Sequence, residues 1–138
     1  MGTTSARSVA PRVLGVAYPS LYVRDLEAAT AFYEPLLGPV EYREKGLIGI
    51  RLGDTWLTLF DAKLMGLAAE NPRNAEFALR LGSPEDVDEM FRRFVAAGAK
   101  AVMAPQDTRM YIAMRYACVD DPHGLRLSIY HPTSAPPQ

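Results

Sequence analysis

The stretch "SLYVRDLEAATAFYEPLLG", residues 20–38, changes its hydrophobic period once, and this change decides how the rest of the chain is interpreted. Apolar and polar residues alternate over residues 14–23, which is typical of a half-buried strand. From Leu26 onward apolar side chains recur every three or four residues, which predicts an amphipathic helix capped by Asp25 and ended by a Gly-Pro pair. This stretch therefore predicts a strand followed directly by a helix that packs against it.

The same order of elements returns in the second half of the chain. Residues 75–81 alternate, Ser83 and Pro84 form a strong helix start, and the apolar stripe that follows continues to Gly98. Each predicted helix is followed by three strand candidates. After the first helix they are residues 40–44, 47–52 and 55–61, and after the second they are residues 100–105, 112–119 and 125–131. Each half therefore reads β-α-β-β-β, and the parallel between "LTLFD" and "LSIYH" supports an internal duplication of about 55–60 residues.

Composition limits the classes of function. The 138 residues are enough for one domain, and a net charge of -1 gives no field to attract nucleic acid or anionic lipid. No apolar run is long enough to span a membrane, and the start of the sequence lacks the apolar centre of a secretory signal, so we expect a cytoplasmic protein. The single cysteine, Cys118, lies in an apolar stretch and is expected to be a buried side chain without a chemical role.

Four segments resemble the vicinal oxygen chelate superfamily, which includes glyoxalases, extradiol dioxygenases, fosfomycin-resistance enzymes and bleomycin-resistance proteins. They are residues 20–38, 83–100, 105–108 and the closing "DDPHGLRLSIYH" at 120–131. The resemblance covers residues 14–131, which we expect to form a single domain. It implies an α+β fold of two tandem βαβββ modules that form a curled mixed sheet around a cleft, with the helices outside. The expected modules and tails are residues 14–62, 74–131, 1–12 and 132–138.

The resemblance also implies where a metal ion would be held. In the superfamily His, Gln or Glu residues on the first and last strands of each module bind the metal when one is present. The matching positions are Tyr18, Thr58, Glu76 and Ser128. Catalytic metal sites need about three imidazole, thiolate or carboxylate ligands, and only Glu76 belongs to these classes. His123 falls in a turn and His131 on the strand face opposite Ser128, so we expect no metal and no other cofactor.

Strand alternation predicts which side chains line the cleft, because residues two apart share a face. The predicted set combines aromatic rings with a few polar groups, as small-molecule sites do. It consists of Tyr18, Ser20, Tyr22, Trp56, Thr58, Phe60, Glu76, Arg80, Ser128 and Tyr130. Arg115 is a further candidate, which either reaches the cleft mouth to pair with Glu76 or an anionic ligand, or forms a surface salt bridge.

Several functions fit these residues, and the sequence leaves open whether the protein is an enzyme. The first interpretation is a small-molecule-binding protein with a degenerate metal site that sequesters an aromatic or antibiotic-like compound, planar and cationic or zwitterionic, against Glu76. The resemblance implies that such proteins are homodimers with clefts between their subunits.

The alternatives use the same cleft differently. A metal-free isomerase, epimerase or cyclase would use Glu76 as a base, with Tyr18 or Tyr22 steadying an oxyanion. A metal-dependent glyoxalase- or dioxygenase-like enzyme would need ligands outside the predicted set. A fourth interpretation is that the fold only provides a surface for dimer formation and binds no ligand. The identity of the ligand, the dimer geometry and the roles of loops 61–74 and 105–113 are not fixed by the sequence.

Overall fold

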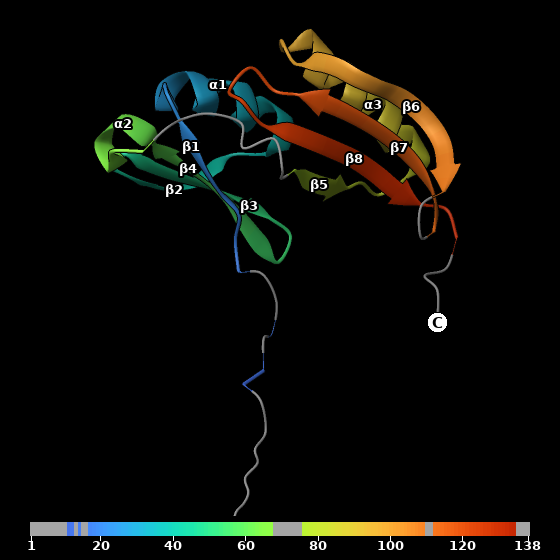
Figure 1. Cartoon of the computed structure of the whole chain (residues 1–138), viewed down its shortest axis with the longest axis horizontal. Coiled ribbons are helices and arrows are strands. Elements are labelled where there is room, and N and C mark those ends of the chain that lie inside the picture. The colour runs from blue at the N-terminus through green and yellow to red at the C-terminus, as the bar shows by residue number, and fades with distance from the viewer. Residues whose placement is uncertain (1–10, 13, 15–16, 68–75, 110–111, 135–138) are drawn as a thin grey trace, which may run out of the picture.

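The computed structural model describes residues 11–12, 14, 17–67, 76–109 and 112–134. It confirms the α+β class and the two βαβββ modules, which form two separate four-stranded mixed sheets (Figure 1). The strand orders are β1-β4-β3-β2 and β5-β8-β7-β6, so the two modules repeat one topology. In the part of the chain that the structure describes, the two sheets are not joined into one.

The first module contains the predicted strand-helix unit and three further strands. Its elements are β1 (Ser20–Val23), α1 (Leu26–Leu37), β2 (Val40–Glu44), β3 (Leu47–Leu52) and β4 (Thr55–Asp61). Strand β1 pairs in parallel with β4, whereas the other neighbours are antiparallel. The predicted cap is confirmed, because the Asp25 carboxylate accepts a hydrogen bond from the Ala28 amide at 3.0 Å. The first strand is shorter than the alternation over residues 14–23 predicts.

The second module repeats this order. Its elements are β5 (Phe77–Arg80), α3 (Pro84–Ala96), β6 (Lys100–Arg109), β7 (Ala113–Asp120) and β8 (Arg126–Pro132). The Ser83 hydroxyl accepts from the Asp86 amide at 3.0 Å, which confirms the predicted helix start. Strand β6 extends to Arg109, so residues 105–109 are strand and not the expected loop, because β7 supplies paired backbone groups that far.

The segment between the modules was expected to be a loop over residues 61–74. Its described part contains a short helix, α2 (Ala62–Met65), capped by the Asp61 carboxylate. Residues 68–75 and, in the second expected loop, Met110 and Tyr111 lie outside the described residues.

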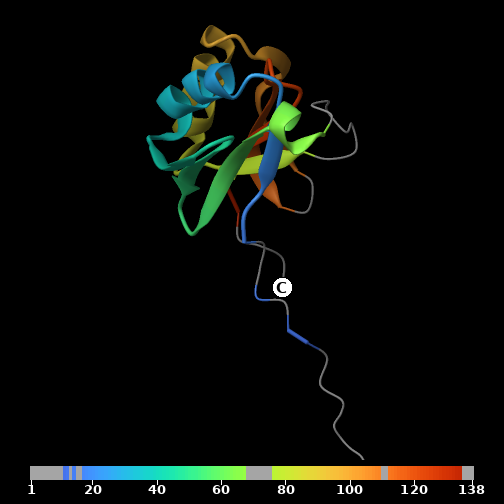
Figure 2. The same ribbon diagram turned by 90° about the vertical axis from the view of Figure 1, so that its left-hand side faces the viewer.

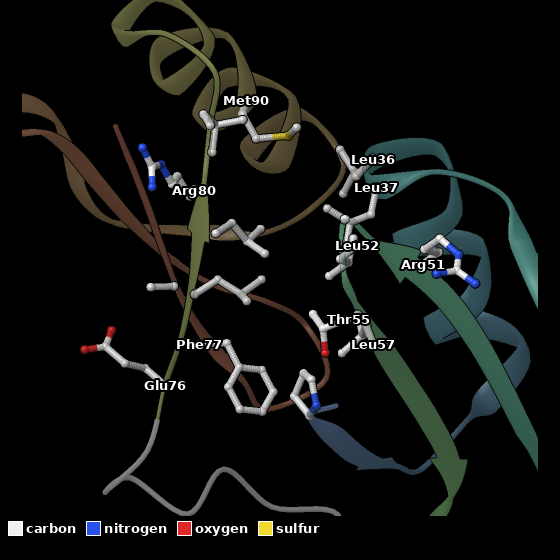
Figure 3. Close-up of a pocket in the computed structure, with 16 residues that line it drawn as sticks. Leu36, Leu37, Arg51, Leu52, Thr55, Leu57, Glu76, Phe77, Arg80 and Met90 are labelled. Carbon is white, nitrogen blue, oxygen red and sulfur yellow. The ribbon is translucent and has the colours of Figure 1, made fainter. Parts of the chain in front are cut away.

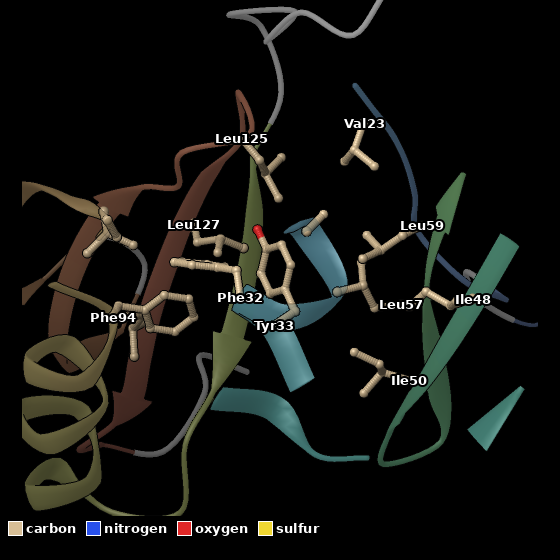
Figure 4. Packing of buried hydrophobic residues seen from close by; sticks show 14 of the residues in the cluster. Val23, Phe32, Tyr33, Ile48, Ile50, Leu57, Leu59, Phe94, Leu125 and Leu127 are labelled. Atoms are coloured by element: carbon tan, nitrogen blue, oxygen red, sulfur yellow. The ribbon is translucent and has the colours of Figure 1, made fainter. Parts of the chain in front are cut away.

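The two modules pack against each other through the faces that carry the helices (Figures 1 and 2). Phe32 of α1 meets Phe94 of α3 with ring centroids 6.0 Å apart, and both belong to one continuous core. Figure 4 shows α1 side chains between residues of the two sheets. The fully buried core residues from both modules include Val23, Tyr33, Ile48, Ile50, Leu59, Val87, Phe94, Val119, Leu127 and Ile129.

A buried polar contact also joins the modules. The Tyr33 hydroxyl on α1 donates a hydrogen bond to the carboxylate of Asp121, which precedes β8. The other Asp121 oxygen accepts from the backbone amides of His123 and Leu125, so this carboxylate holds the turn and the helix together. The ring of His123 packs edge-on against Phe32 with ring centroids 5.6 Å apart, so this turn residue is half-buried.

Candidate functional site

Each sheet has one face that packs on the shared core and one that is turned away from it. We call the latter the open face. On the first sheet, register places Ser20 opposite Thr58 and Tyr22 opposite Phe60, with Trp56 in the same row. On the second sheet, Ala78 lies opposite Ser128 and Arg80 opposite Tyr130. The strand faces predicted for these residues are therefore confirmed.

The first open face is lined by aromatic rings. The rings of Tyr22 and Phe60 are 5.6 Å apart, and the guanidinium of Arg51 lies 4.4 Å from the ring centroid of Trp56. Tyr22 remains 41% exposed although its neighbours are large and apolar. This face therefore offers stacking surface that the described residues do not cover.

A short chain of hydroxyl groups crosses the first open face. The Thr58 hydroxyl donates to the carbonyl oxygen of Pro19 at 3.1 Å and lies 2.5 Å from the Ser20 hydroxyl. Since a hydroxyl has one proton, Thr58 accepts from Ser20. This chain ends on a neutral backbone carbonyl.

The second open face carries a longer polar chain that ends on a charge. The Ser128 hydroxyl donates to Glu76 Oε2 at 2.7 Å, and the Tyr116 hydroxyl lies 2.9 Å from the Ser128 oxygen. Burial raises the pKa of Tyr116, and it also raises the pKa of Cys118, which lies opposite Ser128. At neutral pH the phenol and the thiol are therefore protonated.

Two arginines lie on the same open face as these hydrogen bonds. Arg126 makes two hydrogen bonds to Asp120, at 2.8 and 3.1 Å, so its charge is balanced on the same face. Arg80 is four residues from Glu76 along an extended strand, a separation of about 13 Å. In the close-up of Figure 3 the side chains of Glu76 and Arg80 point away from the space between the two sheets.

The predicted site residues do not gather in one place within the chain. Ser20, Tyr22, Trp56, Thr58 and Phe60 lie on the first open face, and Glu76, Arg80, Ser128 and Tyr130 on the second. The faces are turned away from each other because the helix-bearing faces are the ones that pack together. Consequently Glu76 and Tyr18, the pair needed by the isomerase interpretation, belong to different modules. Tyr18 lies just before β1 and is 55% exposed.

Arg115 lies with the core-facing row and not on either open face. Its guanidinium binds the Asp88 carboxylate of α3 at 2.9 and 3.1 Å and Asp107 at 3.3 Å. These contacts match the surface salt bridge that the sequence allowed, and they keep Arg115 away from Glu76. His131 lies opposite Arg115, and its Nδ1 contacts the Leu81 carbonyl at 2.8 Å.

A cavity of about 880 Å³ lies between the modules, but it is not the predicted cleft. Its wall is made by core-facing leucines, among them Leu52, Leu57, Leu79 and Leu81, together with Met90 (Figure 3). Strand alternation separates these side chains from the open faces. The cavity is therefore a mainly apolar gap between the modules. Glu76 and Arg80 of the neighbouring strand also border it, but their side chains point away from it (Figure 3), and neither Ser128 nor Tyr116 lines it.

The fold agrees with a comparison against protein families. The profile described as "Glyoxalase/Bleomycin resistance protein/Dioxygenase superfamily" matches residues 15–129. The chain belongs to this superfamily. The comparison with curated proteins gave no match.

Solved structures of the glyoxalase superfamily share this fold. A glyoxalase-related enzyme from Fulvimarina pelagi superposes with a TM-score of 0.74 at 22% identity, covering 91% of this chain and 96% of that one. A glyoxalase/bleomycin resistance protein/dioxygenase from Nocardioides gives 0.72 at 25% identity, covering 95% and 91%. A lactoylglutathione lyase from Agrobacterium tumefaciens gives 0.65 at 22% identity, covering 88% and 96%. At such identities the likeness concerns the fold and not the reaction.

The residues at the positions that the superfamily resemblance assigns to metal binding do not fit a catalytic metal ion. Glu76 is the one carboxylate among Tyr18, Thr58, Glu76 and Ser128, and the two aliphatic hydroxyls are engaged by protein acceptors. Within the described part of the chain, no three His, Cys, Asp or Glu side chains converge to hold a metal ion. Nor, among the helices described, is any long and apolar enough to cross a membrane.

Sequence reasoning missed Tyr116 as a site residue. The signal was present, because Met114, Tyr116 and Cys118 alternate with core residues in strand β7. Applying period two to this strand would have placed Tyr116 on the same face as Ser128.

Proposed function

We propose that the protein binds a small organic molecule with an aromatic ring system, in a cleft between the first open face of one copy and the second open face of another. The observation that carries this proposal is the outward orientation of both open faces. In a single chain each face is only half a cleft, yet together they hold the residues that the superfamily resemblance assigns to the site.

The chemistry of the two faces is complementary. The first supplies the stacking rings of Tyr22, Trp56 and Phe60, and the second supplies fixed polar groups around Glu76. Small-molecule sites combine a large apolar surface with a few oriented polar groups. A flat ring held against the first face would bring its polar substituents to the second face.

A homodimer accounts for the exposure of these faces. Large exposed side chains occur on both sheets, including Tyr22 at 41% and Met103 at 41%. Contiguous exposed apolar surface commonly marks an interaction site, and a two-fold dimer would form two equivalent clefts. Light scattering over a range of protein concentrations is expected to give the mass of two chains, and a monomer that still binds ligand tightly would refute the shared cleft.

Ligand binding can be followed directly because Trp56 is the chain's single tryptophan. Titration with a panel of planar aromatic compounds, covering neutral, cationic and anionic members, is expected to give saturable quenching by at least one class. Tyr22→Ala should weaken that binding about three- to tenfold, since an aromatic pair contributes about 0.5–1.5 kcal/mol. Tyr22→Phe, which keeps the ring, is the matched control. A flat response across the whole panel would contradict the proposal.

A further inference from the structure

The second open face fixes the direction of its hydrogen bonds by elimination. The Glu76 carboxylate can only accept, so the single proton of Ser128 points to Glu76 Oε2. Ser128 must then accept from Tyr116, whose hydroxyl is 2.9 Å away. The hydrogen bonds therefore run in one direction, from Tyr116 through Ser128 to Glu76.

This arrangement restrains the carboxylate by one oxygen and leaves the other available. Ser128 is 5% exposed and comes from the interior of the sheet, so the donor to Oε2 is held by packed strands. Glu76 itself is exposed, and among the described residues no hydrogen bond is made to its Oε1. The available oxygen is an acceptor on the open face and shares the negative charge of the carboxylate.

The neighbouring arginines do not neutralise the Glu76 carboxylate. Arg126 interacts with Glu76 through space, but its two hydrogen bonds go to Asp120, whose carboxylate balances its charge. Arg80 is about 13 Å away along the strand, which exceeds the screening length of about 8 Å at physiological salt. A group that approaches Oε1 therefore meets an acceptor that favours an N–H donor, especially a cationic one.

We infer that the site selects ring compounds that carry a protonated or hydrogen-bond-donating nitrogen, and that Tyr116 and Ser128 are positioning residues which orient Glu76 for this contact. The inference rests on the proposed function, because the ligand must first enter the shared cleft. Nothing in it requires chemistry on the ligand, since the contact is a charge-assisted hydrogen bond.

Two probes with the same ring system and opposite substituents test the inference on the full-length protein. These are 9-aminoacridine, which carries an N–H donor and is cationic when protonated, and acridine-9-carboxylate, which is an anion. The wild type is expected to bind the amine about tenfold or more tightly than the carboxylate, because a hydrogen bond to a charged group contributes about 1.5–3 kcal/mol. Equal affinities would overturn the assigned ligand class while leaving the binding function intact.

Five variants separate the roles of the residues. Glu76→Gln should abolish the preference, and Ser128→Ala and Tyr116→Phe should each reduce it about three- to fivefold, as expected for loss of one hydrogen bond. Ser128→Thr keeps the hydroxyl and should restore the preference, which separates positioning from a general packing effect. Glu89→Gln removes a carboxylate on the outer side of α3 and serves as the charge control, with the preference unchanged.

The outcomes are distinguishable. Loss of preference in Glu76→Gln with full preference in both Ser128→Ala and Tyr116→Phe would overturn the positioning role alone. If neither probe binds the wild type, the inference falls together with the proposed function. Circular dichroism and the thermal midpoint of each variant establish that it is folded, and Ser128→Thr supplies the folded reference if Ser128→Ala is unstable.

Discussion

The two modules share a scaffold but differ at the one place where each open face carries polar groups. In the first module Ser20 donates to Thr58, and the chain ends on the Pro19 carbonyl. In the second module register puts Ala78 where Ser20 stands, and the donor to the serine is Tyr116 from a different strand. That chain ends on Glu76, which carries a full charge. A duplicated fold can thus preserve its core while one copy acquires a charged acceptor and the other keeps a neutral aromatic face.

The largest losses of stability should come from truncating core side chains. These losses should be equal in the two modules, because both modules contribute to one core. Leu59 and Ile129 occupy matching places in β4 and β8, and both are 0% exposed. Leu59→Ala and Ile129→Ala should each lower the free energy of unfolding by about 2–5 kcal/mol. Urea denaturation measures both losses. A large loss in only one module would show that the two halves do not contribute to a common core.

The polar chains should differ in their contribution to stability. Ser128→Ala removes the partner of both Tyr116 and Glu76 and should cost about 1–3 kcal/mol. Thr58→Val should cost less than about 1 kcal/mol, because the Pro19 carbonyl keeps the Thr58 backbone amide as a donor at 3.1 Å. Equal losses in the same denaturation experiment would remove the distinction between the two chains.

The contact between the modules should be sensitive to alkaline pH. Burial raises the pKa of Tyr33, and the Asp121 carboxylate raises it further. The folded-state pKa thus exceeds the unfolded value of 10.0, so this contribution to stability is fully present below pH 10 and is lost as pH rises above it. The loss from Tyr33 should be about 1.4 kcal/mol per pH unit above pH 10.

Tyr33→Phe isolates this contribution, because it keeps the ring in the core and removes the ionising group. The free energy of unfolding of the variant should fall less steeply than that of the wild type between pH 9 and pH 11. Parallel curves for the two proteins would mean that ionisation of the buried Tyr33 phenol does not contribute to the loss of stability at alkaline pH.

The smallest effect should come from the solvent-facing side of α3, which differs from α1 in its ion pairs. Hydrogen bonds from Arg92 and Arg93 lower the pKa of Glu89 to about 2. A lowered carboxyl pKa stabilises the folded state above the unfolded value and is lost as pH falls toward 2, but solvent screens exposed pairs strongly. Glu89→Gln should leave the thermal midpoint at pH 7 within experimental error, and a loss as large as that of Ser128→Ala would contradict this ranking.

Local signals in the sequence were sufficient for the elements and their faces. The caps Asp25 and Ser83 and the period-two pattern of β4 and β8 depend on residues close together in the chain, so they could be read directly. The packing of one module on the other depends on contacts such as Tyr33 with Asp121, which are 88 residues apart. Because both faces of each sheet carry apolar side chains, periodicity alone could not say which faces meet.

For the site residues too, local signals predicted the strand faces but not how the modules pack. Ser20, Thr58 and Ser128 were placed on the correct faces by alternation, whereas the distribution of the site over two outward faces is a property of the whole chain. The length of β6 was missed because Pro105 resembles the end of a strand. Its neighbour β7 nevertheless pairs with β6 beyond that proline. Edge strands accept proline, and β6 is an edge strand.

The central claim is that one cleft takes its two walls from two copies of the chain, and mixing two defective variants tests it most directly. Tyr22→Ala damages the first open face and Glu76→Gln the second, so each variant alone should bind 9-aminoacridine weakly. After the two are unfolded together and refolded, random pairing should restore about a quarter of the wild-type number of tight sites, because half of the dimers would contain one intact cleft. Calorimetry counts these sites. Recovery at that level supports the shared cleft, and a mixture that binds no better than its components would contradict it.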